Sequence, residues 1–305
     1  MVVRQWIILP EDSRLPEANA ETFLTEYHEK VGRMWSGKFY DNYKNVEWPW
    51  YNYPFQSDFT QPRTTFVPEP IEKINAKSII EIGSAMGQGY LTLKNSGLVE
   101  LDGFAGYDSS EDGQKFCRKT YPEAKWVEDD FTKSDLTQRF EFGYERHAIH
   151  HMPEPLVQQK KVMQAIDKAV IFTFRGRVTG ETVSDLTKSY INHTKTAGFA
   201  EGGRVFLNQI NVLDTINIGR ELGFNHIGIR VGIHEAVQSE DPDRFGLYID
   251  PDVKKSGGRL MRFTVLFARE PKLSKPIFYA FPGQRRVLLT YDYYKLKQSI
   301  SRLAE

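Results

Sequence analysis

Residues 78–89, Ser-Ile-Ile-Glu-Ile-Gly-Ser-Ala-Met-Gly-Gln-Gly, decide the fold of this chain. An apolar run of strand length carries the carboxylate of Glu81 near its end and opens into a glycine-rich turn, after which apolar residues recur at helical spacing. The stretch therefore predicts a strand, a tight turn and a helix. Glycine lets a ligand approach the backbone closely, and a helix start offers N–H groups and the positive end of a dipole. We interpret this turn as the floor of a nucleotide-type pocket.

Strand and helix patterns alternate from about residue 71 onward. Strands are expected at 78–83, 103–108, 125–128, 140–144, 169–174, 224–233 and 260–268. Helices are expected at 87–95, 111–121, 153–163, 206–222 and, in a polar stretch, 183–197. No helix separates the last two strands, and parallel crossovers are right-handed. The pattern predicts an α/β fold with a doubly wound, mostly parallel, Rossmann-like seven-stranded sheet that ends in an antiparallel strand pair.

The chain divides into three parts by composition and pattern. They are a helical and aromatic-rich lid segment at 1–70, a main domain at 71–270 with insertions at 175–205 and 234–258, and a C-terminal extension at 271–305. Aromatic residues crowd the stretch between residues 34 and 66, where prolines forbid one long helix. This stretch is read either as a hydrophobic flap packed on the main domain or as a lid that lines an acceptor pocket, and the two readings are compatible. The candidate substrate contacts are Trp35, Tyr40, Tyr43 and Trp50.

Composition narrows the class of protein. The 305 residues are 40% hydrophobic and 26% charged, which is ordinary for a globular enzyme. Lys plus Arg and Asp plus Glu number 40 each, so no overall positive field favours nucleic acid or a membrane surface. The single cysteine cannot form an intramolecular disulfide, and no segment resembles a secretory signal or a membrane span. We expect a cytoplasmic enzyme without nucleic-acid or membrane partners, and a homo-oligomer is compatible with the sequence.

Side chains suited to binding or catalysis follow the predicted strands at their carboxyl ends, where doubly wound sheets bind ligands. They are Glu81, Asp108, Asp130 and the pair His150 and His151. Together with the glycine pattern of residues 81–87, this order resembles class I S-adenosylmethionine-dependent methyltransferases over roughly residues 75–270. The resemblance implies S-adenosylmethionine as cofactor and S-adenosylhomocysteine as product.

The resemblance also implies roles for individual residues. The glycine-rich turn would pack beneath the methionine part of the cofactor, Asp108 would accept hydrogen bonds from the ribose hydroxyls, and Asp130, or Asp129 in its place, would contact the adenine amino group. Glu81 would organise the amino-acid end of the cofactor. The implied cofactor-binding residues are Glu81, Gly83, Ser84, Ala85, Gly87, Asp108, Ser109, Asp130, Phe131 and Glu145.

The glycine-rich turn departs from the family pattern at Ala85, which stands where many members have a glycine. A positive φ there would cost on the order of 1 kcal/mol or more. A second, mild departure is Glu141, in place of the aspartate that commonly opens the fourth strand. Dinucleotide-binding domains also place an acidic residue at about the distance of Asp108, but the order of the glycines and the closing strand pair favour the methyltransferase.

Histidines after the fourth strand are the candidates for catalysis. Methyl transfer requires an acceptor atom held in line with the methyl group, and a base where the acceptor carries a proton. His151 and His150 are expected near that point, and the competing interpretation is that they cap or pack the following helix. With His147 they could be read as metal ligands, but no carboxylate stands at matching spacing, so no metal is expected.

These patterns predict a methyltransferase that acts on an oxygen or nitrogen of a small-molecule acceptor, such as a sugar, an antibiotic or another secondary metabolite. Arg175 is the candidate contact for an anionic acceptor, although a solvated loop charge is the favoured interpretation of this residue. The alternatives are a methyltransferase acting on protein or nucleic acid, and a non-catalytic cofactor-binding scaffold. The sequence leaves open the acceptor, the methylated atom and the oligomeric state.

Overall fold

The computed structural model describes residues 76–95, 97, 103–129, 131–193, 203–233, 246–257 and 261–269. Several sequence predictions lie outside these residues: the lid segment 1–70 with Trp35, Tyr40, Tyr43 and Trp50, the extension 271–305, and Asp130. The strands and helices of the described part are β1 (Ile79–Ile82), α4 (Gln88–Asn95), β2 (Phe104–Asp108), α5 (Glu111–Thr120), β3 (Lys125–Glu128), β4 (Phe140–Arg146), the 3-10 turn η2 (Ile149–His151), α6 (Pro155–Gln164), β5 (Ile166–Arg177), β6 (Ser189–His193), β7 (Gly203–Phe206), β8 (Ile210–Asn211), α7 (Val212–Glu221), β9 (His226–Ile233), β10 (Gly246–Ile249), α8 (Pro251–Gly257) and β11 (Met261–Ala268).

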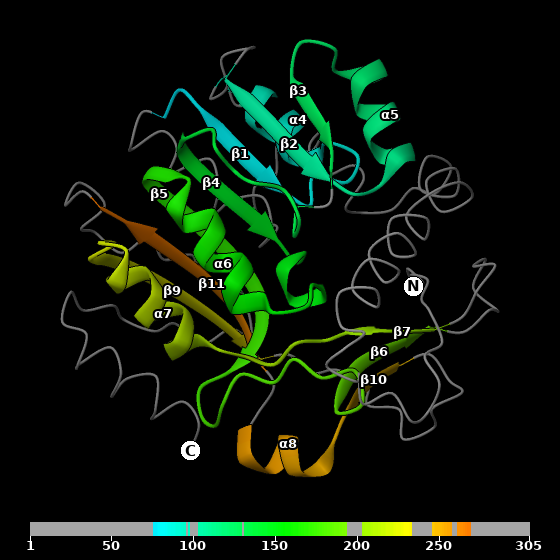
Figure 1. The fold of residues 1–305 in the computed structure, drawn as a ribbon, viewed down its shortest axis with the longest axis vertical. Coiled ribbons are helices and arrows are strands. Elements are labelled where there is room, and N and C mark those ends of the chain that lie inside the picture. The colour runs from blue at the N-terminus through cyan, green and yellow to red at the C-terminus, as the bar shows by residue number, and fades with distance from the viewer. Residues whose placement is uncertain are drawn as a thin grey trace.

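The main sheet has the order β3-β2-β1-β4-β5-β11-β9, and the two-residue strand β8 pairs with β5 (Figure 1). Strands β1 to β5 run parallel to one another, whereas β11 is antiparallel to both β5 and β9. The predicted fold class, a doubly wound and mostly parallel sheet with a final antiparallel pair, is therefore confirmed. The strand order reverses direction between β1 and β4, and this reversal is where sheets of this kind bind ligands.

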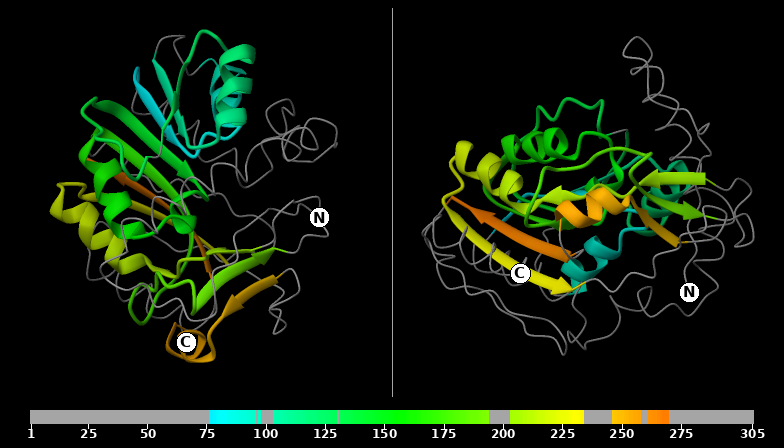
Figure 2. Two further views of the ribbon diagram at one scale, coloured as in Figure 1. Left: turned by 45° about the vertical axis from the view of Figure 1, so that its right-hand side comes forward. Right: turned by 90° about the horizontal axis from the view of Figure 1, so that it is seen from below.

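Helices cover both faces of the main sheet. On one face, α6 and α7 pack over Ile80, Val170 and Phe172, and Figure 2 shows these two helices together on one side. On the other face, Tyr90 and Leu93 of α4 pack with residues of β1, β2, β4 and β5 in a second apolar cluster. The central strands are buried on both sides, which explains their nearly continuous apolar sequences.

A second, antiparallel sheet with the order β10-β6-β7 joins the two predicted insertions. Figure 1 shows it on the side toward which β1, β2 and β4 point. The predicted helix at 183–197 is wrong, because this stretch contains β6, whose Tyr190 and Ile191 pair with partners in β7 and β10. A polar stretch without a clear period carries no signal for partners so distant in sequence.

Three further boundaries differ from the prediction. Strand β5 continues to Arg177, beyond the predicted end at 174, because β11 and β8 extend its ladder. The helix predicted at 206–222 begins only at Val212, since β7 and β8 occupy its first residues. The stretch 234–258, expected to be a polar excursion, contributes β10 and α8. In the described part of the chain, no helix is long and apolar enough to cross a membrane.

Candidate active site

The backbone N–H groups of the glycine-rich turn after β1 are hydrogen-bonded within the protein. The N–H groups of Gly83 and Ser84 both donate to the carbonyl of Tyr107 in β2, and the Gly87 N–H donates to the Ser84 carbonyl over 2.8 Å. The Ala85 N–H donates to the Asp108 carboxylate over 2.8 Å. The turn is therefore fastened to the end of β2 and does not offer these four amides to a phosphate.

Ala85 adopts the left-handed conformation that is unfavourable for a residue other than glycine. Its φ is +48°, between Gly83 at +72° and Gly87 at +74°. A non-glycine residue in this region costs on the order of 1–2 kcal/mol. The hydrogen bond to Asp108 is the contact that holds Ala85 there, because it fixes the direction of the Ala85 N–H.

The glycines of the turn are required by close packing against other parts of the protein. A Cβ on Gly83 would overlap the Cβ of Ala148, and one on Gly87 would lie 2.9 Å from the Trp126 ring. A Cβ on Gly89 would overlap the Tyr144 hydroxyl and the Glu81 carboxylate. The contact between Gly83 and Ala148 brings the glycine-rich turn directly against the turn that carries the histidines.

Asp108, at the carboxyl end of β2, joins two backbone turns. Its Oδ2 accepts from Ala85 N–H, and its Oδ1 accepts from Ser110 N–H over 2.9 Å. Burial raises the pKa of Asp108, and these two donors oppose the shift. Each carboxylate oxygen can accept a second hydrogen bond, so the residue keeps acceptor capacity for the hydroxyls of a ligand.

Beneath the start of α4, Glu81 takes part in a buried ion pair that the sequence did not reveal. Glu81 is 1% exposed, and its Oε1 pairs with Arg146 Nη2 at 3.0 Å. The strand register places Tyr144 opposite Glu81, with the hydroxyl beside the carboxylate. Burial raises the pKa of Glu81 in spite of the Arg146 charge. Arg146 was missed because its link to Glu81 depends on the pairing of β1 with β4.

The three histidines lie in the turn at 147–152 that follows β4, here called the histidine turn. Glu145, on the opposite face of β4 from Arg146, holds the start of this turn. Its carboxylate accepts from the N–H groups of Ala148 and Ile149, and from Thr173 N–H of β5 over 3.3 Å. Burial raises the pKa of Glu145 to about 8, and the three backbone donors oppose this shift. These contacts give Glu145 a structural role in orienting the turn, and its contact with a cofactor stays a prediction.

The histidine turn is short and strongly constrained. His147 has a φ of +63°, and its N–H donates to Thr173 O over 2.9 Å. His150 is 1% exposed, whereas His151 is half-buried, and their ring centres lie 4.0 Å apart. Nδ1 of His151 lies 2.7 Å from the carbonyl oxygen of Phe206. Because a carbonyl only accepts, Nδ1 carries the proton and Nε2 of the neutral ring is left as a proton acceptor.

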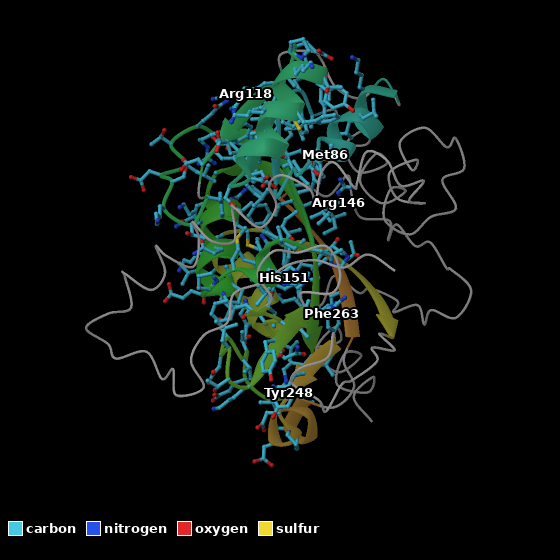
Figure 3. All side chains as sticks on the ribbon, turned by 90° about the vertical axis from the view of Figure 1, so that its right-hand side faces the viewer. Met86, Arg118, Arg146, His151, Tyr248 and Phe263 are labelled. Carbon is cyan, nitrogen blue, oxygen red and sulfur yellow. The ribbon has the colours of Figure 1, made fainter. Side chains whose placement is uncertain are left out.

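Figure 3 looks at the carboxyl-end side of the sheet, where Met86 of the glycine-rich turn, Arg146 of β4 and His151 are labelled. Of the other predicted residues, Ser84 is buried and its Oγ accepts from Gln114 Nε2 over 3.0 Å. Ser109 is half-buried in the turn between β2 and α5, and Arg175 is half-buried in β5. These placements leave their predicted contacts with ligands untested.

Phe131 is 3% exposed and belongs to the core on the α6 side, where the Lys161 ammonium lies 5.0 Å from its ring centre. Among the described residues, no group of three or more His, Cys, Asp or Glu side chains could hold a metal ion.

No protein-family model matches this chain, and no curated protein matches it in sequence. Solved structures match it in fold. The N-terminal domain of EvdMO1 with S-adenosylhomocysteine bound is 13% identical, with 69% of this chain and 82% of that chain covered and a TM-score of 0.46. The DhpI complex with S-adenosylhomocysteine is 12% identical, with coverage of 83% and 98% and a TM-score of 0.46.

A third similar structure is the magnesium protoporphyrin IX methyltransferase ChlM from Synechocystis PCC 6803 with bound S-adenosylmethionine. It is 11% identical, with 79% of this chain and 97% of that chain covered and a TM-score of 0.39.

Proposed function

We propose that this protein is an S-adenosylmethionine-dependent methyltransferase that methylates an oxygen or nitrogen of a small-molecule acceptor. The observation that carries the proposal is the closed glycine-rich turn at the β1–β4 reversal, with its amides turned inward and its Ala85 N–H on the Asp108 carboxylate. A dinucleotide needs the N–H groups of such a turn for its pyrophosphate. A turn that keeps them inside, beside a carboxylate, suits an uncharged ribose and a cationic sulfonium instead.

The residues at the turn fit this cofactor in kind. Asp108 retains acceptor capacity for ribose hydroxyls, and the half-buried backbone at Gly83 and Ala85 forms the surface of the turn. The pair of Glu81 and Arg146 supports the turn from below, at the end where the methionine part would lie. When bound, the cofactor supplies a methyl group on a positively charged sulfur.

The chain's own contribution to methyl transfer is the position of His151. Transfer of the methyl group to the acceptor oxygen or nitrogen would break the bond between the methyl carbon and the cofactor sulfur, and the acceptor would lose its proton. His151 Nε2 receives that proton, because Nδ1–H is engaged with the Phe206 carbonyl. His150, almost fully buried, is the alternative base. The packing of Gly83 against Ala148 keeps the histidine turn beside the glycine-rich turn.

Ligand-dependent thermal unfolding tests the cofactor. S-adenosylmethionine or S-adenosylhomocysteine at 100 times its dissociation constant adds about 2.7 kcal/mol to the free energy of unfolding. We expect both to raise the melting temperature and NAD to leave it unchanged. A rise with NAD alone would contradict the proposal.

Consumption of S-adenosylmethionine tests the catalysis. Wild type is assayed with a panel of hydroxyl- and amine-bearing small molecules, and the His151→Ala variant serves as the comparison. We expect turnover with at least one class of acceptor and a loss of about 100-fold or more without the base. Tight cofactor binding without turnover on any acceptor would favour the non-catalytic scaffold.

A further inference from the structure

The small sheet β10-β6-β7 is joined to the histidine turn by three hydrogen bonds with residues 206–208, at the end of β7 and directly after it. The Phe206 carbonyl accepts from His151 Nδ1–H over 2.7 Å, and the Asn208 N–H donates to the His150 carbonyl over 2.9 Å. The Asn208 side-chain Nδ2 donates to the carbonyl of Met152. These partners lie more than 50 residues apart in sequence, so the base depends on a distant segment of the chain for its orientation.

The turn is held from opposite ends by two buried side chains. At its start, the Glu145 carboxylate accepts from Ala148 and Ile149 N–H. At its end, the Asn208 side-chain Nδ2 donates to the Met152 carbonyl, and the Asn208 backbone N–H adds a bond to the His150 carbonyl. A 3-10 turn of three residues has few internal hydrogen bonds, and Ala148 provides no side-chain cap. Its geometry therefore depends on these external partners.

We propose that Asn208 is a positioning residue, which fixes the Nδ1–H tautomer of His151 by holding the end of the turn against the Phe206 carbonyl. The inference rests on the proposed function, in which Nε2 of His151 accepts the proton. Asn208 is 1% exposed, and its amide is oriented by the Met152 carbonyl. Without that bond the end of the turn moves, the His151–Phe206 distance lengthens, and the ring proton is no longer confined to Nδ1.

Gln209 provides a matched control. It is also a buried amide, 3% exposed, and follows Asn208 directly in the chain. Its Nε2 donates to the Ser189 hydroxyl over 3.0 Å and to the Leu207 carbonyl over 2.9 Å, and neither acceptor belongs to the histidine turn. Replacing either amide by alanine removes buried hydrogen bonds from the same segment, but only the Asn208 side chain contacts the histidine turn.

The test is the tautomer of His151, measured by NMR on protein labelled with ¹³C and ¹⁵N in histidine, with His151→Ala to assign the ring signals. In wild type the neutral ring is expected in the Nδ1–H form. Asn208→Ala, and Asn208→Leu with a similar side-chain volume, should lower the ratio of Nδ1–H to Nε2–H by about fivefold, the fold-change equivalent to about 1 kcal/mol. Gln209→Ala should leave the ratio unchanged.

Binding of S-adenosylhomocysteine separates this inference from the proposed function. All three variants should bind it within about twofold of wild type, since the hydrogen bonds of these two side chains go to Met152, Ser189 and Leu207, which are not predicted cofactor residues. An unchanged tautomer ratio in both Asn208 variants would overturn the inference, as would an equal change in Gln209→Ala. Failure of wild type to bind S-adenosylhomocysteine would overturn the proposed function, whereas the tautomer ratios would still decide the role of Asn208.

Discussion

The glycine-rich turn and the histidine turn meet at Gly83 and Ala148, but they are built in different ways. The first is closed by neighbours along the sheet, through the Tyr107 carbonyl and the Asp108 carboxylate at the end of the adjacent strand. The second is held by Glu145 from below and by residues 206–208, at the end of a strand of the small sheet. The comparison teaches that the cofactor side of the proposed site belongs to the main sheet, whereas the catalytic side depends on the small sheet.

The largest expected effect comes from the contact between the two turns. Gly83→Ala places a Cβ against the Ala148 Cβ at a φ of +72°. Left-handed strain of about 1–2 kcal/mol and overpacking of about 1–3 kcal/mol should together lower the free energy of unfolding by about 2–5 kcal/mol. Urea unfolding measures this loss.

Gly97→Ala is the control for that experiment, because Gly97 also has a positive φ, +67°, but a Cβ there would meet no atom of the described residues within 4 Å. It should lose only the strain, about 1–2 kcal/mol. Equal losses at Gly83 and Gly97 would show that the two turns are not in close contact.

A smaller effect is expected from Asp108→Ala, which removes the acceptor for both the Ala85 and the Ser110 N–H. The loss of these bonds should lower the free energy of unfolding by about 2 kcal/mol. Loss of the ribose contacts should also weaken S-adenosylhomocysteine binding by about tenfold or more, measured by isothermal titration calorimetry. The control is Asp135→Ala, an exposed acid, and an affinity unchanged by Asp108→Ala would remove that residue from the site.

Glu145 should make the histidine turn sensitive to pH. Burial raises its pKa from 4.5 to about 8, so the folded protein binds the proton more tightly than the unfolded chain. The resulting stabilisation is complete below about pH 4.5 and is lost as the pH rises toward 8. The free energy of unfolding of wild type, measured with urea, should therefore fall relative to that of Glu145→Gln as the pH rises from 5 to 8.

Glu123→Gln tests the sign of that result. A hydrogen bond from Lys94 lowers the pKa of Glu123 to about 2, so its stabilisation is present above about pH 4.5 and is lost as the pH falls toward 2. The two variants should thus respond to pH in opposite directions. A flat pH dependence for Glu145→Gln would show that Glu145 has an ordinary pKa.

The smallest effect is expected at Ala85. Ala85→Gly relieves left-handed strain of about 1–2 kcal/mol but adds about 0.4–1 kcal/mol of backbone entropy to the unfolded chain. The free energy of unfolding should rise by about 0.5 kcal/mol. Ala165→Gly, at a φ of −84°, gains no such relief and should lose about 0.5–1 kcal/mol. A loss at both positions would contradict the strain at Ala85.

The sequence predicted the parts of the molecule whose signals are local. The strand, turn and helix at 78–95 follow from the spacing of apolar residues and glycines, and Asp108 follows from the end of an apolar strand. The pairing of Glu81 with Arg146 depends on strand register. The pairing of His151 with the Phe206 carbonyl depends on a strand that is distant in sequence. The wrong helix at 183–197 has the same cause, because β6 is stabilised by distant strands.

The most direct test of the proposed function is a crystal structure of the protein grown with S-adenosylhomocysteine. The ligand should lie over the glycine-rich turn, with its ribose hydroxyls on the Asp108 carboxylate and its sulfur on the side of His151. Density for the ligand at another place, or a turn without ligand in crystals grown well above the dissociation constant, would contradict the proposed site.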